Sequence, residues 1–272
     1  MSGDHAYDPV DGLGAVLGDD AVLRLTIRRP ERRGSIDDAI GLALADHLVA
    51  AGKDEAVRAI LVGSDGPDFC AGSDLTAKNT GGPRPRVGSI QRRLPSTFHR
   101  VVPLLLETQV PVVAAVRGWA AGLGFHLALA ADFCVAAGRA RFWEPFLARG
   151  FTPDSGATWL LPRLVGLARA RQLVLLGREL SGEEAAEWGL IHAAVPDDQV
   201  DGEAEALAVH LAQGPTVALG LAKWLLTAGA DTGLADQLRN EAFALELSSR
   251  SEDFREGLAS FRDKREPEYR GR

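Results

Sequence analysis

The feature that most constrains this sequence is a repeated order of apolar strand, turn and helix over its first two thirds. Apolar runs bounded by turn residues predict strands at residues 21–30, 57–64, 110–116 and 131–137. The segment 35–52 predicts a helix, with Ser35 or Asp37 at its start and Gly52 at its end. This alternation predicts an α/β core of parallel strands with short connections.

The last third of the sequence carries only helical signals. Ser181 and Glu184 have the spacing of a capping box. Four further helices are expected near residues 202–213, 215–228, 233–249 and 251–265. We therefore divide the chain into a core, residues 12–195, and a helical C-terminal region, residues 196–272. The segment 79–95, with Gly-Gly, three prolines and four arginines, predicts a surface loop.

Composition narrows the classes of function. The chain of 272 residues has a formal net charge of −7, which argues against general nucleic-acid binding because that needs a basic surface. Cys70 and Cys134 have neither metal-ligand spacing nor a disulfide pattern, and no signal-peptide pattern begins the sequence. We therefore expect a cytoplasmic protein without a metal site. The most apolar stretch, 119–137, contains His126 and Asp132, which argues against a membrane span.

Two glycine turns follow strands at places where helices are expected to begin. They are ILVGSDGPDFCAGSDL and VVAAVRGWAAGLGFHLALA. Such turns direct backbone N–H groups out of the sheet end, and two of them together can supply both donors of an oxyanion hole. Neither turn matches the P-loop or the dinucleotide fingerprint, and the sequence has no Gly-x-Ser-x-Gly elbow. Nucleoside triphosphates, NAD and serine-hydrolase chemistry are therefore not expected.

Four motifs occur in order and at fitting distances along the chain. They are DFCAGSDL (68–75), VPVVAAVRGWAAGLGFHLALAADF (110–133), TPDSGATWLLPRLVG (152–166) and SEDFREGLASFRDKREPEYRG (251–271). From about residue 12 onward the sequence resembles the crotonase superfamily, the enoyl-CoA hydratases and isomerases. The wording PDSGATWLLPR is most like the isomerases of the phenylacetate pathway. The resemblance implies a core of repeated ββα units and C-terminal helices that assemble trimers, often paired into hexamers.

The resemblance also implies a coenzyme A thioester as the substrate, with no separate cofactor. Two backbone N–H groups would hold the thioester oxygen, and they map to Ala71 and Leu123. The other implied substrate contacts map to Arg32, Ser73, Asp74, Leu75, Gly122, Phe146, Phe261 and Lys264. The last two would reach the nucleotide end of the coenzyme, often from a neighbouring subunit. Such an anionic ligand suits the local clusters of basic residues at 28–33, 84–93 and 262–265.

Both glutamates that the hydratases of this superfamily use are absent. The first position, three residues after Leu123, holds His126, and the second holds Phe146. Glu144 lies two residues before Phe146, an offset that would not direct it to the same place. The hydratase pattern therefore fails at both acids.

Asp154 lies eight residues after Phe146, where carboxylates act in dienoyl-CoA isomerases of the superfamily. One carboxylate suffices for a 1,3-proton shift, since it can take a proton from one carbon and return it to another. We predict Asp154 as the catalytic acid and base, with capping of the following helix as a compatible second role. His126 is either a second catalytic or acyl-contacting group, or a buried residue with a satisfied hydrogen bond.

These residues favour an enoyl-CoA isomerase that moves a double bond or rearranges a ring through a thioester enolate. An enoyl-CoA hydratase or acyl-CoA hydrolase that uses His126 and Asp154 is the nearest alternative. A CoA-binding protein without catalysis is an alternative of another class. The expected partners are an acyl-CoA and copies of the same chain, with no nucleic acid and no membrane.

Overall fold

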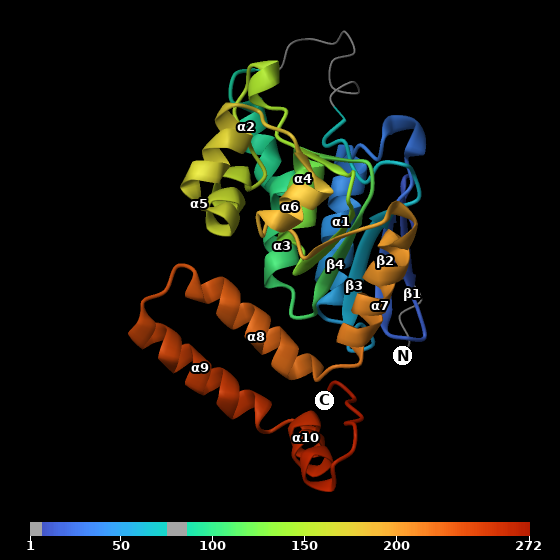
Figure 1. Ribbon diagram of the computed structural model, residues 1–272, viewed down its shortest axis with the longest axis vertical. Helices are drawn as coiled ribbons and strands as arrows, with labels where there is room; N and C mark the ends of the chain where they lie inside the picture. Colours follow the sequence, from blue (N-terminus) through green and yellow to red (C-terminus); the bar gives the residue numbers. More distant parts are fainter. Residues whose placement is uncertain (1–6, 75–85) are drawn as a thin grey trace.

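Figure 1 shows a layered α/β core from which two long helices, α8 and α9, extend toward a last helix, α10. The computed structural model describes residues 7–74 and 86–272. The α/β class and the helical C-terminal region expected from the sequence are both confirmed. In the described part of the chain, no helix is both long enough and apolar enough to span a membrane.

A six-stranded sheet forms the centre of the core. Its strands lie in the order β1 (Leu13–Leu17), β2 (Val22–Ile27), β3 (Ala59–Ser64), β4 (Val112–Val116), β6 (Phe133–Ala137) and β9 (Ala193–Val195). Only the β1–β2 pair is antiparallel in this sheet. Every residue of β4 is buried, as is typical of a parallel strand covered on both faces. All four strands expected from apolar runs are present, as β2, β3, β4 and β6.

A smaller sheet completes the ββα units. It consists of β5 (Trp119–Ala121), β7 (Arg141–Trp143) and β8 (Leu180–Ser181). The order β4–β5 precedes α4 (Leu123–Ala130), and β6–β7 precedes α5 (Ala157–Leu175), which is kinked at Gly166. The short helix α6 (Gly182–Glu187) follows β8, and its Ser181–Glu184 capping box is confirmed.

Helices cover the large sheet. α1 (Asp38–Ala51) packs against α3 (Val101–Glu107), and α3 packs against α4. The side chain of Asp37 accepts the N–H groups of Ala39 and Ile40, so Asp37 rather than Ser35 caps α1. α7 (Val200–Ala212) packs on β3, β4 and β6. It therefore lies against the core although it follows residue 195, and the helices that leave the core begin with α8.

The segment 79–95 is not entirely a loop. Its first part, up to residue 85, lies outside the described residues. Within the rest, α2 (Ser89–Arg93) is helical and is followed by a 3-10 turn, Leu94–Ser96. The prediction was wrong there because Gly88 and Pro95 only flank this short run, and the residues between them are compatible with a helix.

The C-terminal helices expose a large apolar surface. They are α8 (Thr216–Gly229), α9 (Leu234–Ser248) and α10 (Glu252–Asp263). Their exposed apolar side chains include Leu226, Leu234, Leu238, Phe243, Leu245, Leu258 and Phe261. We therefore expect this surface to be covered by another protein surface, as large exposed apolar patches often are.

A buried lysine fastens α8 to the core. Lys223 Nζ lies 2.7 Å from Asp132 Oδ2 and donates to the carbonyl oxygens of Leu105 at 2.7 Å and Val110 at 3.3 Å. Asp132 Oδ2 also accepts the N–H of Val112 at 2.7 Å. Burial lowers the pKa of Lys223 and raises the pKa of Asp132, and the attraction between the two groups opposes both shifts.

We expect Lys223→Met to lower the free energy of unfolding by about 1–3 kcal/mol, because it leaves two buried carbonyl oxygens and a partly exposed carboxylate without their donor. Urea denaturation followed by circular dichroism measures the change. The double variant Lys223→Met with Asp132→Asn should recover part of the loss, since the asparagine amide is neutral and its oxygen still accepts from Val112. If the single variant loses much less unfolding free energy than this, Lys223 is not an important link between α8 and the core.

Candidate active site

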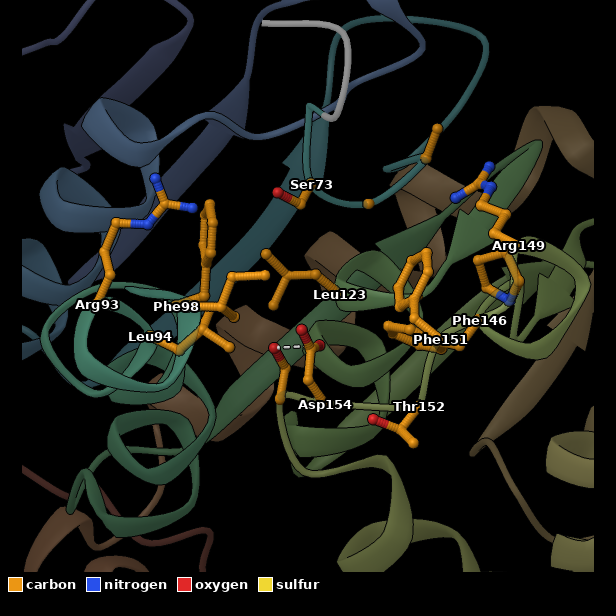
Figure 2. A pocket seen from close by; sticks show the side chains of 16 residues that line it. Ser73, Arg93, Leu94, Phe98, Leu123, Phe146, Arg149, Phe151, Thr152 and Asp154 are labelled. Atoms are coloured by element: carbon orange, nitrogen blue, oxygen red, sulfur yellow. Dashed lines mark hydrogen bonds between the residues drawn. The ribbon is translucent and has the colours of Figure 1, made fainter. Parts of the chain in front are cut away.

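A cavity of about 420 Å³ opens beside the N-terminus of α4, a volume suited to a small organic ligand. Figure 2 shows its lining. Its apolar residues are Ile90, Leu94, Phe98, Leu123, Pro145, Phe146 and Phe151. Its charged residues, within the described part of the chain, are Arg93, Arg149 and Asp154. Asp154 is thus the one described carboxylate in an otherwise apolar and basic cavity.

The two predicted glycine turns meet at this cavity. A Cβ atom at Gly72 (φ 96°) would lie 2.8 Å from the carbonyl oxygen of Ala121 and 3.7 Å from the nitrogen of Leu123. Only glycine permits this approach without strain. Leu123 is the first residue of α4, and its N–H makes no hydrogen bond to any described residue. This N–H is therefore available to a ligand, and its predicted role as an oxyanion donor stays a prediction.

The prediction that Ala71 supplies the second donor was wrong. The N–H of Ala71 donates to the carbonyl oxygen of Arg33 at 2.9 Å, so this donor is already used. The N–H of Ser73 has another direction. The carbonyl oxygen of Ile36 accepts the N–H of Asp74, and the N–H of Ile36 donates to the carbonyl oxygen of Gly72. The N–H of Ser73, which lies between these two bonds, therefore points to the opposite side of the segment. Ser73 also lines the cavity.

Asp154 is held by its neighbour rather than by a helix. It lies half-buried in the loop before α5, where the N-cap position is Gly156 and no side chain caps the helix. The predicted capping role of Asp154 was therefore wrong. Instead, Ser155 Oγ donates to Asp154 Oδ1 at 2.8 Å, and the Ser155 N–H donates to His99 Nε2 at 3.4 Å. Ser155 has a φ of 48°, a strained conformation for a residue other than glycine.

His126 is buried behind the cavity and does not line it. Its side chain is 0% exposed, and its Nε2 lies 2.8 Å from Glu144 Oε1, whose side chain is 1% exposed. Of the two readings of the sequence, the structure supports the buried residue with a hydrogen bond. The sequence did not point to Glu144 as its partner, because His126 lies on α4 and Glu144 lies in the segment after β7.

A groove of about 380 Å³ adjoins the cavity on its basic side. Ala71, Ser73 and Arg149 line both spaces. The other residues of the groove are Glu31, Arg32, Arg33, Ser35 and Asp74. The guanidinium of Arg149 also lies over the ring of Trp143, with its carbon 5.8 Å from the ring centroid. The predicted contacts Arg32, Ser73 and Asp74 are thus brought together, next to the cavity that Gly122 and Phe146 line.

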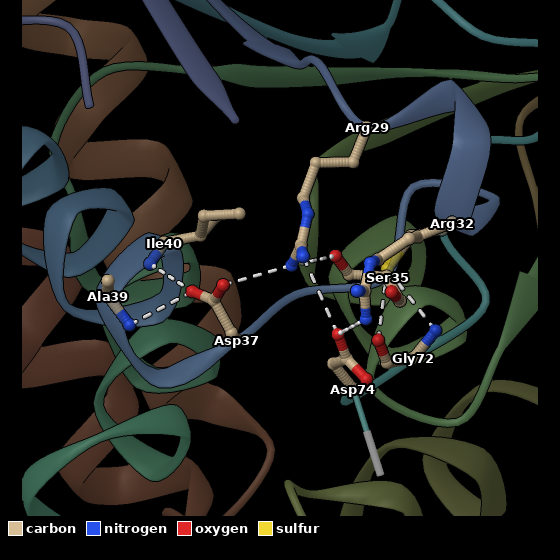
Figure 3. A network of polar contacts seen from close by, with 9 residues as sticks. Arg29, Arg32, Ser35, Asp37, Ala39, Ile40, Gly72 and Asp74 are labelled. Carbon is tan, nitrogen blue, oxygen red and sulfur yellow. Dashed lines mark hydrogen bonds and ion pairs between the residues drawn. The ribbon is translucent and has the colours of Figure 1, made fainter. Parts of the chain in front are cut away.

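Asp74 holds two arginines at the edge of the groove (Figure 3). Its buried Oδ2 lies 2.8 Å from Arg32 Nη1 and 3.5 Å from Arg29 Nη2. Arg29 pairs in turn with Asp37 at 3.0 Å. Asp74 therefore fixes the side chain of Arg32, which remains half-exposed. The next predicted contact, Leu75, lies outside the described residues.

The predicted contacts of the C-terminal helix lie elsewhere. Neither Phe261 nor Lys264 lines the cavity or the groove of its own chain. Phe261 is 85% exposed, and Lys264 ends α10 in a left-handed conformation with a φ of 53°. Contact with a ligand bound by another copy of the chain stays a prediction.

Comparison with known proteins decides the family. The model of the enoyl-CoA hydratase/isomerase family matches residues 18–272. The chain belongs to this family. It is 41% identical to the 1,2-epoxyphenylacetyl-CoA isomerase of Escherichia coli K12, over 92% of this chain and 95% of the relative. It is 32% identical to the 2,3-dehydroadipyl-CoA hydratase of the same strain, over 92% and 96% of the two chains.

Solved structures of the family share the fold. The enoyl-CoA hydratase of Bacillus anthracis matches with a TM-score of 0.89 and 28% identity, over 96% of this chain and 100% of that one. The enoyl-CoA hydratase/isomerase of Cupriavidus metallidurans CH34 matches with a TM-score of 0.88 and 29% identity, over 97% and 98%. The crotonase-like fold predicted from the four motifs is therefore confirmed.

Two substitutions of Ser155 should have the same effect on activity but different effects on stability. Ser155→Ala and Ser155→Gly both remove the hydroxyl that holds Asp154, so both should slow turnover of an enoyl-CoA by about 10- to 100-fold. The glycine variant also relieves the positive φ and should be more stable than the alanine variant by about 1 kcal/mol. Thermal unfolding and initial rates test the pair. Wild-type rates in both variants would show that the hydroxyl does not position Asp154.

Proposed function

We propose that this protein is an acyl-CoA isomerase that shifts a double bond, or rearranges an unsaturated ring, through a thioester enolate. The observation that carries the proposal is the single described carboxylate, Asp154, in a cavity that also holds the N-terminus of α4. A 1,3-proton shift needs one group that exchanges protons and donors that stabilise the enolate. The similarity to an isomerase of 1,2-epoxyphenylacetyl-CoA supports the same reaction class.

In the proposed mechanism, the backbone N–H groups of Ser73 and Leu123 bind the thioester oxygen. They come from two elements that the Gly72 contact brings together, so their spacing is fixed before the substrate binds. Negative charge grows on the oxygen as the α-carbon loses its proton, and fixed donors stabilise the enolate more than the ground state. Removal of one such donor typically lowers kcat by about 100- to 1000-fold.

Asp154 carries the proton in this mechanism. Its carboxylate takes a proton from one carbon of the acyl chain, and the electron pair moves into the enolate. The protonated carboxyl group then returns the proton to a second carbon, which places the double bond in its new position. The number of atoms and electrons in the substrate is unchanged, so no water, oxidant or separate cofactor is needed.

The coenzyme part of the substrate fits the basic groove. Arg32, Arg33 and Arg149 line this space and offer cationic groups to the phosphates of the coenzyme.

We propose that Phe261 and Lys264 complete the nucleotide site of a neighbouring subunit in a trimer or hexamer, since the C-terminal helices expose an apolar surface. Light scattering of the purified protein measures the number of subunits.

We propose that the protein works in the cytoplasm, because Cys70 and Cys134 are both free thiols, as is usual in a reducing compartment.

Hydration of an enoyl-CoA is the second candidate. Its support is the 32% identity to a 2,3-dehydroadipyl-CoA hydratase. A hydratase needs a second group to manage water, and His126, the predicted candidate, is separated from the cavity by Phe146. The geometry therefore favours isomerisation, and the product distinguishes the two reactions.

Incubation of 3-enoyl- and 2-enoyl-CoA thioesters in heavy water tests the proposal. We expect deuterium to enter the acyl chain without addition of water, as measured by mass spectrometry. Asp154→Asn should slow this exchange by at least about 100-fold, because an amide cannot carry the proton. A product heavier by one water supports the hydratase instead. Absence of exchange and of addition across the series, with CoA thioesters still bound, identifies a non-catalytic binding protein.

Leu123→Pro tests the oxyanion donor on the backbone itself. Proline is well tolerated at the first position of a helix, but it has no N–H, so we expect kcat to fall by about 100- to 1000-fold. The control Leu123→Ala loses the same side chain and keeps the N–H, and it should retain most of kcat. Equal rates in the two variants would exclude the Leu123 amide as the donor.

A further inference from the structure

Behind the cavity wall lies a buried polar pair that the proposed mechanism does not use. His126 on α4 and Glu144 after β7 share one hydrogen bond of 2.8 Å in the protein interior. The remaining polar atoms, His126 Nδ1 and Glu144 Oε2, make no hydrogen bond to any described residue. Two apolar side chains would fill this space without the cost of desolvating polar groups. Core packing alone therefore does not account for the pair.

The pair lies directly behind an aromatic wall. The imidazole ring of His126 is parallel to the ring of Phe146, with an interplanar angle of 3° and a centroid distance of 5.9 Å. Phe146 meets the edge of Phe151 at 5.4 Å, and both phenylalanines line the cavity. Phe146 also faces Gly122, where an added Cβ atom would lie 3.5 Å from its ring. The His126 ring thus lies next to Phe146 but outside the cavity that Phe146 lines.

The pair also joins two parts of the site. α4 carries the Leu123 amide, and the segment 144–155 carries the aromatic wall and Asp154. Among the described residues, the His126–Glu144 contact is the one side-chain hydrogen bond between this segment and α4. A hydrogen bond is directional, so it fixes the distance between the two parts more closely than apolar packing does.

We propose that the His126–Glu144 pair is a positioning device that holds Phe146 and thereby sets which acyl groups the cavity accepts. The inference rests on the proposed function only in that the acyl group occupies this cavity. A small displacement of Phe146 changes the room for the end of the acyl chain. One methylene group more or less in an apolar pocket changes discrimination by roughly 10- to 200-fold, so the wall position decides specificity.

Affinity for unreactive thioesters tests the inference separately from catalysis. Isothermal titration gives the Kd of CoA, butyryl-CoA, hexanoyl-CoA, octanoyl-CoA and phenylacetyl-CoA, none of which needs a proton transfer. We expect Glu144→Ala to leave the Kd of CoA unchanged and to reduce the spread among the acyl-CoAs by about 10-fold. Glu144→Gln keeps an oxygen that accepts the His126 N–H, and it should restore the wild-type order and spread.

Two further variants separate positioning from folding. Lys223→Met removes an ion pair whose two residues do not line the cavity, so it should lower stability and keep the acyl selectivity. If Glu144→Ala does not fold, the double variant His126→Leu with Glu144→Leu is measured, because it leaves no buried polar atom without a partner. A wild-type spread in the folded variant overturns the inference, as does a wild type that binds all acyl-CoAs and CoA alike. If the wild type shows no isomerase activity, the proposed function is wrong, but the binding measurements still test the positioning role of the His126–Glu144 pair.

Discussion

The site depends on the close approach of two chain segments, 70–73 and 121–124. A Cβ atom at Gly124 would lie 2.2 Å from the carbonyl oxygen of Cys70, and one at Gly72 would lie 2.8 Å from that of Ala121. Any other residue at either glycine would push the segments apart. This contact places the N-terminus of α4 beside the extended chain at Ser73, where the proposed mechanism has its two backbone donors. The sheet, with β4 buried at its centre, serves to hold that contact.

Much of the fold could be predicted because its signals are local. Apolar runs such as 110–116 form strands, and Asp37 and Ser181 cap helices through bonds to residues two or three positions away. The meeting of two glycine turns could also be predicted, since each turn follows a parallel strand of one sheet. These features need no knowledge of which residues lie far apart in sequence but close in space.

The predictions that were wrong concern contacts between residues that no local sequence pattern reveals. The N–H of Ala71 donates to Arg33 instead, because Ile36 pairs with residues 72–74 and sets the direction of their amides. Asp154 precedes a helix without capping it, since Ser155 turns the chain with a positive φ and binds the carboxylate itself. The partner of His126 could not be predicted either, because Glu144 lies 18 residues further along the chain, outside α4.

The proposed division of labour explains why the donors and the base lie on different kinds of structure. Oxyanion donors act through a fixed geometry, and here they lie on a helix terminus and on a segment paired with Ile36. The base must reach two carbons of the same acyl group, which suits a carboxylate in a loop that, among the described residues, is held by the side chain of Ser155. Because the same loop continues from Phe146, the wall that selects the acyl group also sets where Asp154 meets it. The two proposals together therefore couple specificity and proton transfer through one short stretch of chain.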